Sequence, residues 1–128
     1  MTTTTIIHTA RKADITFYHT GRIEIASHLT KLLHITPGSS IDIAVTPDRE
    51  YILFARPCPS NAPRHSYKAQ CTPTRKGYNT MRCNCVELTA AILSLTGQTE
   101  KARITVGQAT TYNTYPAVYL IVRNILPQ

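Results

Sequence analysis

The sequence has few charged residues, few glycines and no long apolar run, and each shortage excludes a class of protein. Asp, Glu, Lys and Arg make up 16% of the 128 residues, below the roughly 25% of an average soluble protein. Hydrophobic residues still make up 42%, which is enough for a core and excludes wholesale disorder. No run of about 18 apolar residues occurs, so no transmembrane helix is expected. Of the five glycines, four fall at expected turns or helix ends, namely Gly21, Gly38, Gly77 and Gly97. No phosphate-binding loop is therefore expected.

The length predicts one domain, or two very small units that share a core. The first residues, Met1 to His8, lack the charged start and apolar stretch of a secretion signal. We therefore expect a cytoplasmic protein whose four cysteines stay reduced. Residues 1–10 are expected to form a flexible tail, and residues 11–128 a single domain.

Acidic residues are missing from one segment, and this gives the chain its net charge of +7. Residues 56–82 contain no Asp or Glu but six basic side chains, which supply +6 of the total. The segment also holds four prolines together with Tyr67 and Tyr78. Basic groups interleaved with aromatic rings are typical of a surface that binds nucleic acid. The alternative is a solvated connector whose charge only maintains solubility.

The first half of the chain predicts two strand pairs around a short helix. Residues 15–18 and 22–25 alternate apolar and polar side chains around a turn at 19–21, which places Phe17, Ile23 and Ile25 inward. Ser27 is the expected cap of a helix that presents Leu29, Leu32 and Leu33 on one face. Pro37-Gly38 ends the helix, and residues 41–45 and 51–54 form the second strand pair around a turn at 46–48.

The second half repeats this order. Residues 67–71 and 78–83 are expected strands around a basic turn at 75–77. Asn84 and Glu87 fit a capping box, and Gly97 ends a helix. Its apolar face is expected to hold Leu88, Ala91, Ile92 and Leu95. Residues 103–106 and 116–122 form the last hairpin.

The two halves align when Leu29, Thr30 and Leu33 are placed on Leu88, Thr89 and Ile92. The strands align with a slip of one residue, Ile23 on Met81 and Ile25 on Cys83. We therefore predict an internal duplication, with pseudo-repeats at 13–56 and 67–126 and a basic connector at 57–66.

The stretch Gly21-Arg22-Ile23-Glu24-Ile25, followed by the helix and by Ile41-Asp42-Ile43, resembles the core motif of the SpoVT/AbrB family of swapped-hairpin DNA-binding proteins. The resemblance covers about 35 residues well and, through the repeat, about 100. It implies a β-rich α+β fold, a small barrel of interlocked hairpins with two short helices. A chain with two copies, as in MraZ-like proteins, builds that barrel internally.

The resemblance also implies duplex DNA as the partner of a small transcriptional regulator. Arg22 and Lys31 match basic positions of the family motif, whereas Ala26, Thr30, His34 and Ser39 depart from it. Few basic residues remain on the first repeat, so either the phosphate contacts lie in the central segment or the barrel is kept without DNA binding. The predicted nucleic-acid contacts are Arg22, Lys31, Arg64, Lys68, Arg75, Lys76 and Arg82, with Tyr67 and Tyr78 as base-stacking candidates. The alternative is a non-enzymatic protein-interaction module, antitoxin-like or accessory to a mobile element, that assembles as a homodimer or with another protein.

The cysteines suggest little chemistry from their spacing. Cys58, Cys71, Cys83 and Cys85, with His65, supply the residue types of a zinc site, but no pair has the usual knuckle spacing. The simpler interpretation is that Cys83 and Cys85 are small apolar core residues. A Cys71–His65 nucleophile pair has no local activating group, and no paired carboxylates stand in an acid–base arrangement. We expect no catalytic residues, no metal and no cofactor.

Overall fold

The computed structural model describes residues 13–58, 69–74 and 80–122, which form a β-rich α+β fold. The first half contains β1 (Ile15–Tyr18), β2 (Arg22–Ile25), α2 (Ser27–Leu32), β3 (Ser40–Val45) and β4 (Tyr51–Arg56). The second half contains β5 (Thr72–Pro73), β6 (Met81–Asn84), α3 (Val86–Thr96), β7 (Lys101–Tyr112) and β8 (Tyr115–Ile121). Both halves therefore have the expected order of hairpin, helix and hairpin. No helix among the described residues is long and apolar enough to cross a membrane.

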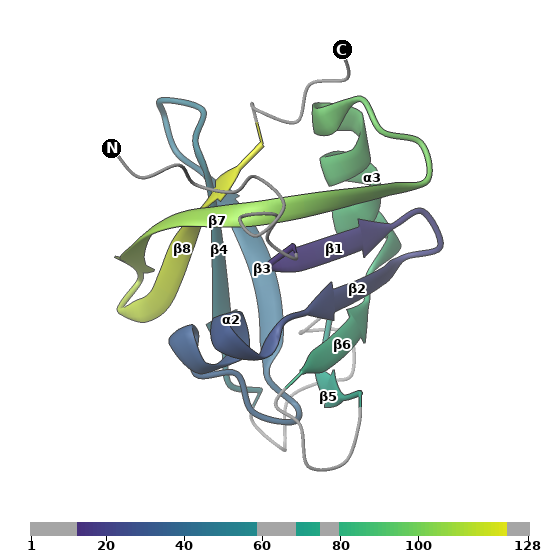
Figure 1. The fold of residues 1–128 in the computed structure, drawn as a ribbon. Helices are drawn as coiled ribbons and strands as arrows, with labels where there is room; N and C mark the ends of the chain where they lie inside the picture. The colour runs from purple at the N-terminus through teal and green to yellow at the C-terminus, as the bar shows by residue number, and fades with distance from the viewer. Residues whose placement is uncertain (1–12, 59–68, 75–79, 123–128) are drawn as a thin grey trace, which may run out of the picture.

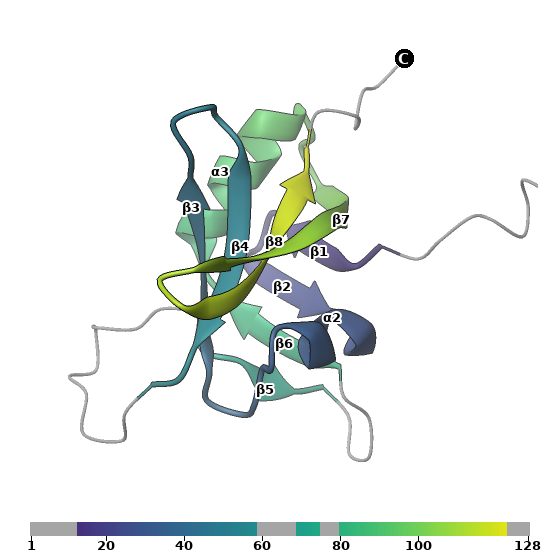
Figure 2. The same ribbon diagram turned by 90° about the vertical axis from the view of Figure 1, so that its left-hand side faces the viewer.

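All eight strands belong to one curled antiparallel sheet in the order β3-β4-β8-β7-β1-β2-β6-β5. The hairpin β1–β2 lies between β7 and β6, and β4 pairs with β8, so hairpins of the two halves alternate. Figure 1 shows the long β7 running across β8 and β1, and Figure 2 shows the β7–β8 hairpin crossing in front of β4. Each half thus completes its hydrogen bonding on strands of the other half.

The two edges of this sheet also meet. Ser40, at the start of β3, forms an isolated antiparallel bridge with Gln70, just before β5. The Cys71 N–H donates to the Ser39 carbonyl at 2.7 Å, and the Gly38 N–H donates to the Cys71 carbonyl at 2.8 Å. The sheet is therefore linked at both β1–β7 and β3–β5, although the second junction is much shorter.

Alternation along the strands places the core inside the curl. Ile15, Phe17, Ile23 and Ile25 are buried, as are Met81 and Cys83 on β6. Ile23 pairs with Cys83 and Ile25 with Met81, so these four side chains share one face. The predicted alignment of the two halves placed Ile23 on Met81 and Ile25 on Cys83, which requires buried residues to match buried residues. They do, whereas an alignment shifted by one further residue would match buried residues with exposed ones. The rest of the core includes Leu29, Leu33, Ile41, Leu53, Ile92, Ala102, Ile104, Val118 and Leu120.

The predicted helix caps are wrong by one residue. Ala26, not Ser27, is the N-cap of α2, and Cys85, not Asn84, is the N-cap of α3; neither helix has a side-chain cap. The Ala26 N–H donates to the carbonyl of Asp14, just before β1, and the Cys85 N–H donates to the carbonyl of Gly21, just before β2. Because each helix follows its strand directly, the residue that still bonds to the neighbouring strand segment is the one that becomes the N-cap.

The predicted apolar faces of both helices also need correction. Leu32 and Leu95 are each 43% exposed and Ala91 is exposed, whereas Thr30, Thr89 and Thr96 are buried. The hydroxyl of Thr30 donates to the Ala26 carbonyl at 3.1 Å, and that of Thr96 donates to the Ile92 carbonyl at 2.9 Å. A threonine whose hydroxyl bonds within its own helix packs as an apolar side chain. The threonines therefore take core positions that the sequence assigned to leucine and alanine.

Gly97 ends α3 in the left-handed conformation, as predicted, with φ of 72°. Gly21 has φ of 102°, and a Cβ there would lie 2.9 Å from the Val86 side chain. The turn between β1 and β2 therefore admits α3 closely only because residue 21 is glycine. The expected strand at 67–71 is wrong in its described part, because β5 begins at Thr72. Ala69 to Cys71 instead form an isolated bridge and backbone hydrogen bonds to residues 38–41.

Candidate functional site

Three of the predicted nucleic-acid residues lie within the described part of the chain. Arg22 is on β2, Lys31 on α2 and Arg82 on β6. The other six lie outside the described residues: Arg64, Tyr67, Lys68, Arg75, Lys76 and Tyr78. The tail at 1–10, most of the connector and His65 also lie outside them.

Strand pairing brings Arg22 and Arg82 onto one outward face with two basic residues that the sequence analysis did not select. Across the sheet, Arg103 pairs with Thr16, Thr16 with Glu24, and Glu24 with Arg82. These four residues form one row across the strands. In the adjacent row Lys101 pairs with Tyr18, whose ring lies next to the Arg22 guanidinium. We name the four cations, Arg22, Arg82, Lys101 and Arg103, together with Glu24, the basic strand face.

The basic strand face points to solvent because the residues between its members point inward. Ala102 and Ile104, which flank Arg103 on β7, are buried, and so are Met81 and Cys83 on either side of Arg82. Lys101, Arg103 and Arg82 are exposed. Their alternation with apolar residues is visible in the sequence, but only the pairing of β7 with β1 places Lys101 and Arg103 beside Arg22.

Arg22 is held by its neighbours on the hairpin. Its guanidinium lies 3.2 Å from a Glu24 carboxylate oxygen and 4.7 Å from the centre of the Tyr18 ring. The Tyr18 hydroxyl donates to the same carboxylate at 3.1 Å. Arg22 is therefore oriented but partly neutralised, whereas within the described residues no ion pair involves Arg82, Lys101 or Arg103. Lys31 is exposed on α2 and is not in either row.

A second polar arrangement lies at the β1–β7 junction. Asp14 is fully buried, and one of its carboxylate oxygens accepts a hydrogen bond from the Val106 N–H at 2.7 Å. The other oxygen pairs with the Nε2 of His28, whose side chain is about half exposed. The carboxylate thereby ties β1 to α2 and β7. A buried carboxylate with such partners is a structural element rather than a reactive one.

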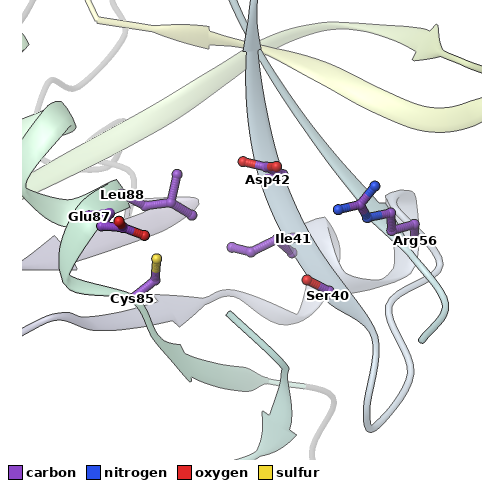
Figure 3. A pocket seen from close by; sticks show the side chains of 7 residues that line it. All are labelled: Ser40, Ile41, Asp42, Arg56, Cys85, Glu87 and Leu88. Atoms are coloured by element: carbon purple, nitrogen blue, oxygen red, sulfur yellow. The ribbon is translucent and has the colours of Figure 1, made fainter. Parts of the chain in front are cut away.

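A pocket of about 380 Å³ opens near the β3–β5 junction, between β3, the end of β4 and the first turn of α3. Figure 3 shows Cys85, Glu87 and Leu88 on one side and Ile41 pointing toward them from β3, with Asp42 and Arg56 beyond it. The lining combines two carboxylates, a guanidinium, a hydroxyl and a thiol. The Asp42 carboxylate accepts a hydrogen bond from the Ile43 N–H at 2.8 Å. Among the described residues no histidine lines the pocket, so they form no nucleophile–histidine–carboxylate triad there.

Cys71 and Cys85 both lie near Cys83. Among the described residues, no group of three or more His, Cys, Asp or Glu side chains is placed to hold a metal ion. Cys71 and Cys83 are buried and Cys58 and Cys85 half-buried, all as free thiols. A hydrogen bond with Cys71, and then burial, raise the pKa of the Cys83 thiol. Cys83 is therefore protonated and weakly nucleophilic while it stays buried in the core.

No family model, curated protein or solved structure matches the chain. The basic strand face is therefore the feature of the described residues on which a function can be argued.

Proposed function

We propose that this chain binds duplex DNA through the basic strand face. Strand pairing supports the proposal, because it gathers Arg22, Arg82, Lys101 and Arg103 on one outward surface with a single carboxylate among them. Adjacent strands lie about 4.8 Å apart, so the rows from β7 to β6 span about 14 Å, close to the roughly 12 Å width of the major groove. Such a surface contacts several phosphates at once, which gives affinity with little sequence information.

The arrangement of hairpins supports the finer proposal that the fold is a swapped-hairpin barrel of the SpoVT/AbrB type. In the strand order, each hairpin of one half is flanked by hairpins of the other half. A duplicated chain with interlocked hairpins is expected to have this alternation. The resemblance of residues 21–43 to the family motif points the same way, and that family's members bind DNA.

The proposal is tested by titrating labelled duplex DNA with the protein at several salt concentrations and measuring fluorescence anisotropy. The wild type is expected to bind with a log affinity that falls linearly with log salt. Arg103→Ala should weaken binding to all duplexes and reduce the salt slope by about one unit, because one phosphate contact is lost. The matched control is Arg49→Ala, which removes one positive charge from the exposed turn between β3 and β4 and should leave the affinity unchanged.

Glu24→Gln provides a test of opposite sign. Because Glu24 is the only carboxylate on the basic strand face and pairs with Arg22, its neutralisation should tighten binding and steepen the salt dependence. An absence of binding at low salt contradicts the function. If Arg103→Ala and Arg49→Ala weaken binding equally, the result contradicts the position of the site on the basic strand face.

A second candidate function, a protein-interaction module, is favoured by a separate apolar cluster. The Phe54 ring lies tilted against Tyr112, with 4.6 Å between ring centres, and is stacked with Tyr115 at 6.3 Å. These rings, with Ile52, Ala117 and the half-buried Tyr119, lie outside the main core. Tyrosine and phenylalanine are enriched at protein interfaces. A stoichiometric partner that copurifies and resists high salt, from a protein that does not bind DNA, would favour this function.

A further inference from the structure

Cys71 and Cys83 lie directly opposite one another across β5 and β6. Thr72 pairs with Arg82 and Pro73 with Met81 in antiparallel register. Continuing this register by one residue places Cys71 opposite Cys83. Both side chains then point to the same face of the sheet, which agrees with their burial at 0% and 2% exposure.

The backbone hydrogen bonds show which kind of antiparallel pair this is. The Thr74 N–H donates to the Thr80 carbonyl, and bonded and non-bonded pairs alternate along an antiparallel ladder. Counting back from Thr74 and Thr80 makes the Cys71–Cys83 pair non-hydrogen-bonded. In agreement, the N–H and the carbonyl of Cys71 both bond toward β3, to Ser39 and Gly38.

A non-hydrogen-bonded pair suits a disulfide. Its Cα atoms lie about 4.5 Å apart, within the range of about 4.4–6.8 Å found for disulfides. Both residues are free thiols, and Cys71 is the neighbour that most raises the pKa of the Cys83 thiol. Cys85 is the nearest competitor, but it precedes α3, lines the pocket and is half-buried.

We propose that Cys71 and Cys83 form an oxidisable dithiol site that closes to a cross-strand disulfide. With hydrogen peroxide as oxidant, one thiol sulfur attacks the O–O bond and becomes a sulfenic acid as one water leaves. The second sulfur then attacks the sulfenic sulfur, the S–S bond forms and a second water leaves. In total, two thiols lose two electrons and two protons, and one peroxide becomes two waters.

Closure of the site would fix the weakest strand of the sheet. β5 consists of two residues and pairs with β6 at two positions, and Gln70 just before it meets β3 through one bridge. Short, little-packed segments open most readily, and the buried thiols become accessible to oxidant when β5 separates. Oxidation is therefore expected to be slow in the native protein, to accelerate in mild denaturant and to raise resistance to unfolding.

The experiment treats reduced full-length protein with hydrogen peroxide, blocks the remaining thiols with iodoacetamide and maps tryptic peptides without reduction. Trypsin cuts after Lys68, Arg75, Arg82 and Lys101, so the two cysteines fall on different peptides. We expect peptide 69–75 to be linked to peptide 83–101 and to be released by dithiothreitol.

Cys85→Ser distinguishes Cys83 from Cys85, which share that second peptide. The linked peptide should persist in Cys85→Ser and in Cys58→Ser, and should disappear in Cys83→Ala, with folding of each variant followed by circular dichroism. The wild type and Cys85→Ser decide the outcome even if Cys83→Ala fails to fold. The absence of an intramolecular disulfide in these two proteins, or one that contains Cys58 or Cys85, overturns the proposal.

Discussion

The two junctions between the halves of the molecule occupy corresponding places in the order of elements but are built differently. At the first, β1 and β7 pair over four residues, from Ile15 to Tyr18. At the second, β3 and the residues before β5 share a single bridge, Ser40 with Gln70. Ile15 pairs with Ile25, and Cys71 lies opposite Cys83, the residue aligned with Ile25. Asp14 and Gln70 are therefore equivalent, and each precedes a fully buried side chain.

The difference between the junctions comes from individual side chains. Asp14 is buried and bonds to the Val106 N–H and to His28, whereas Gln70 is exposed. In the alignment of the helices, the equivalent of His28 is Glu87, which lines the pocket near the second junction. A glutamate cannot donate as an imidazole does. The two halves therefore share one order of elements, whereas differences between individual side chains make one junction strong and the other weak.

The largest effect is expected where the halves remain alike. Leu33 and Ile92 are aligned helix positions, each 1% exposed. Replacing either by alanine should lower the free energy of unfolding by about 3 kcal/mol, because a buried aliphatic side chain is lost and a cavity remains. Urea denaturation measures both variants. Leu32→Ala, at an exposed helix position, should cost less than about 1 kcal/mol, and an equal loss in Leu32→Ala and Leu33→Ala would contradict the observed helix face.

A smaller effect should separate the two junctions. Asp14→Ala leaves the Val106 N–H without its carboxylate, and we expect it to lower the free energy of unfolding by about 2 kcal/mol. Gln70→Ala at the equivalent exposed position should change it by less than about 0.5 kcal/mol. Both are measured by urea denaturation under the same conditions. Similar losses in the two variants would remove the proposed contrast between the junctions.

The smallest effect is a dependence of stability on pH from Cys83. Its pKa is raised in the folded protein by the hydrogen bond with Cys71 and by burial, so the folded state keeps the proton while the unfolded thiol ionises. This contribution is fully present below the unfolded thiol pKa of about 8.5 and is lost as pH rises above it. Under reducing conditions the free energy of unfolding should fall by up to about 1.4 kcal/mol per pH unit between about pH 9 and 10. Cys83→Ala should flatten this part of the profile, and an unchanged slope would show that other groups cause it.

Much of the fold was predictable from local patterns. The strands around residues 15–25 and 41–54 were predicted, because apolar alternation, turn residues and Pro-Gly act over short distances. The helix faces and caps were not, because Thr30, Thr89 and Thr96 satisfy their hydroxyls within the helix and the cap amides bond to distant strands. For the candidate site, Arg22 and Arg82 were selected by charge, but Lys101 and Arg103 join them only through strand pairing.

The sequence by itself determined the β-rich class, the two-part order of elements and the excess of positive charge, since periodicity and composition are local properties of the chain. Tertiary structure alone decided which strands became neighbours. It aligned four cations in two rows, buried Asp14 between β1, α2 and β7, and brought Cys71 opposite Cys83. The physical reason is that backbone hydrogen bonds between strands far apart in sequence fix the register. Because side chains alternate between the two faces of a sheet, the register decides which side chains meet.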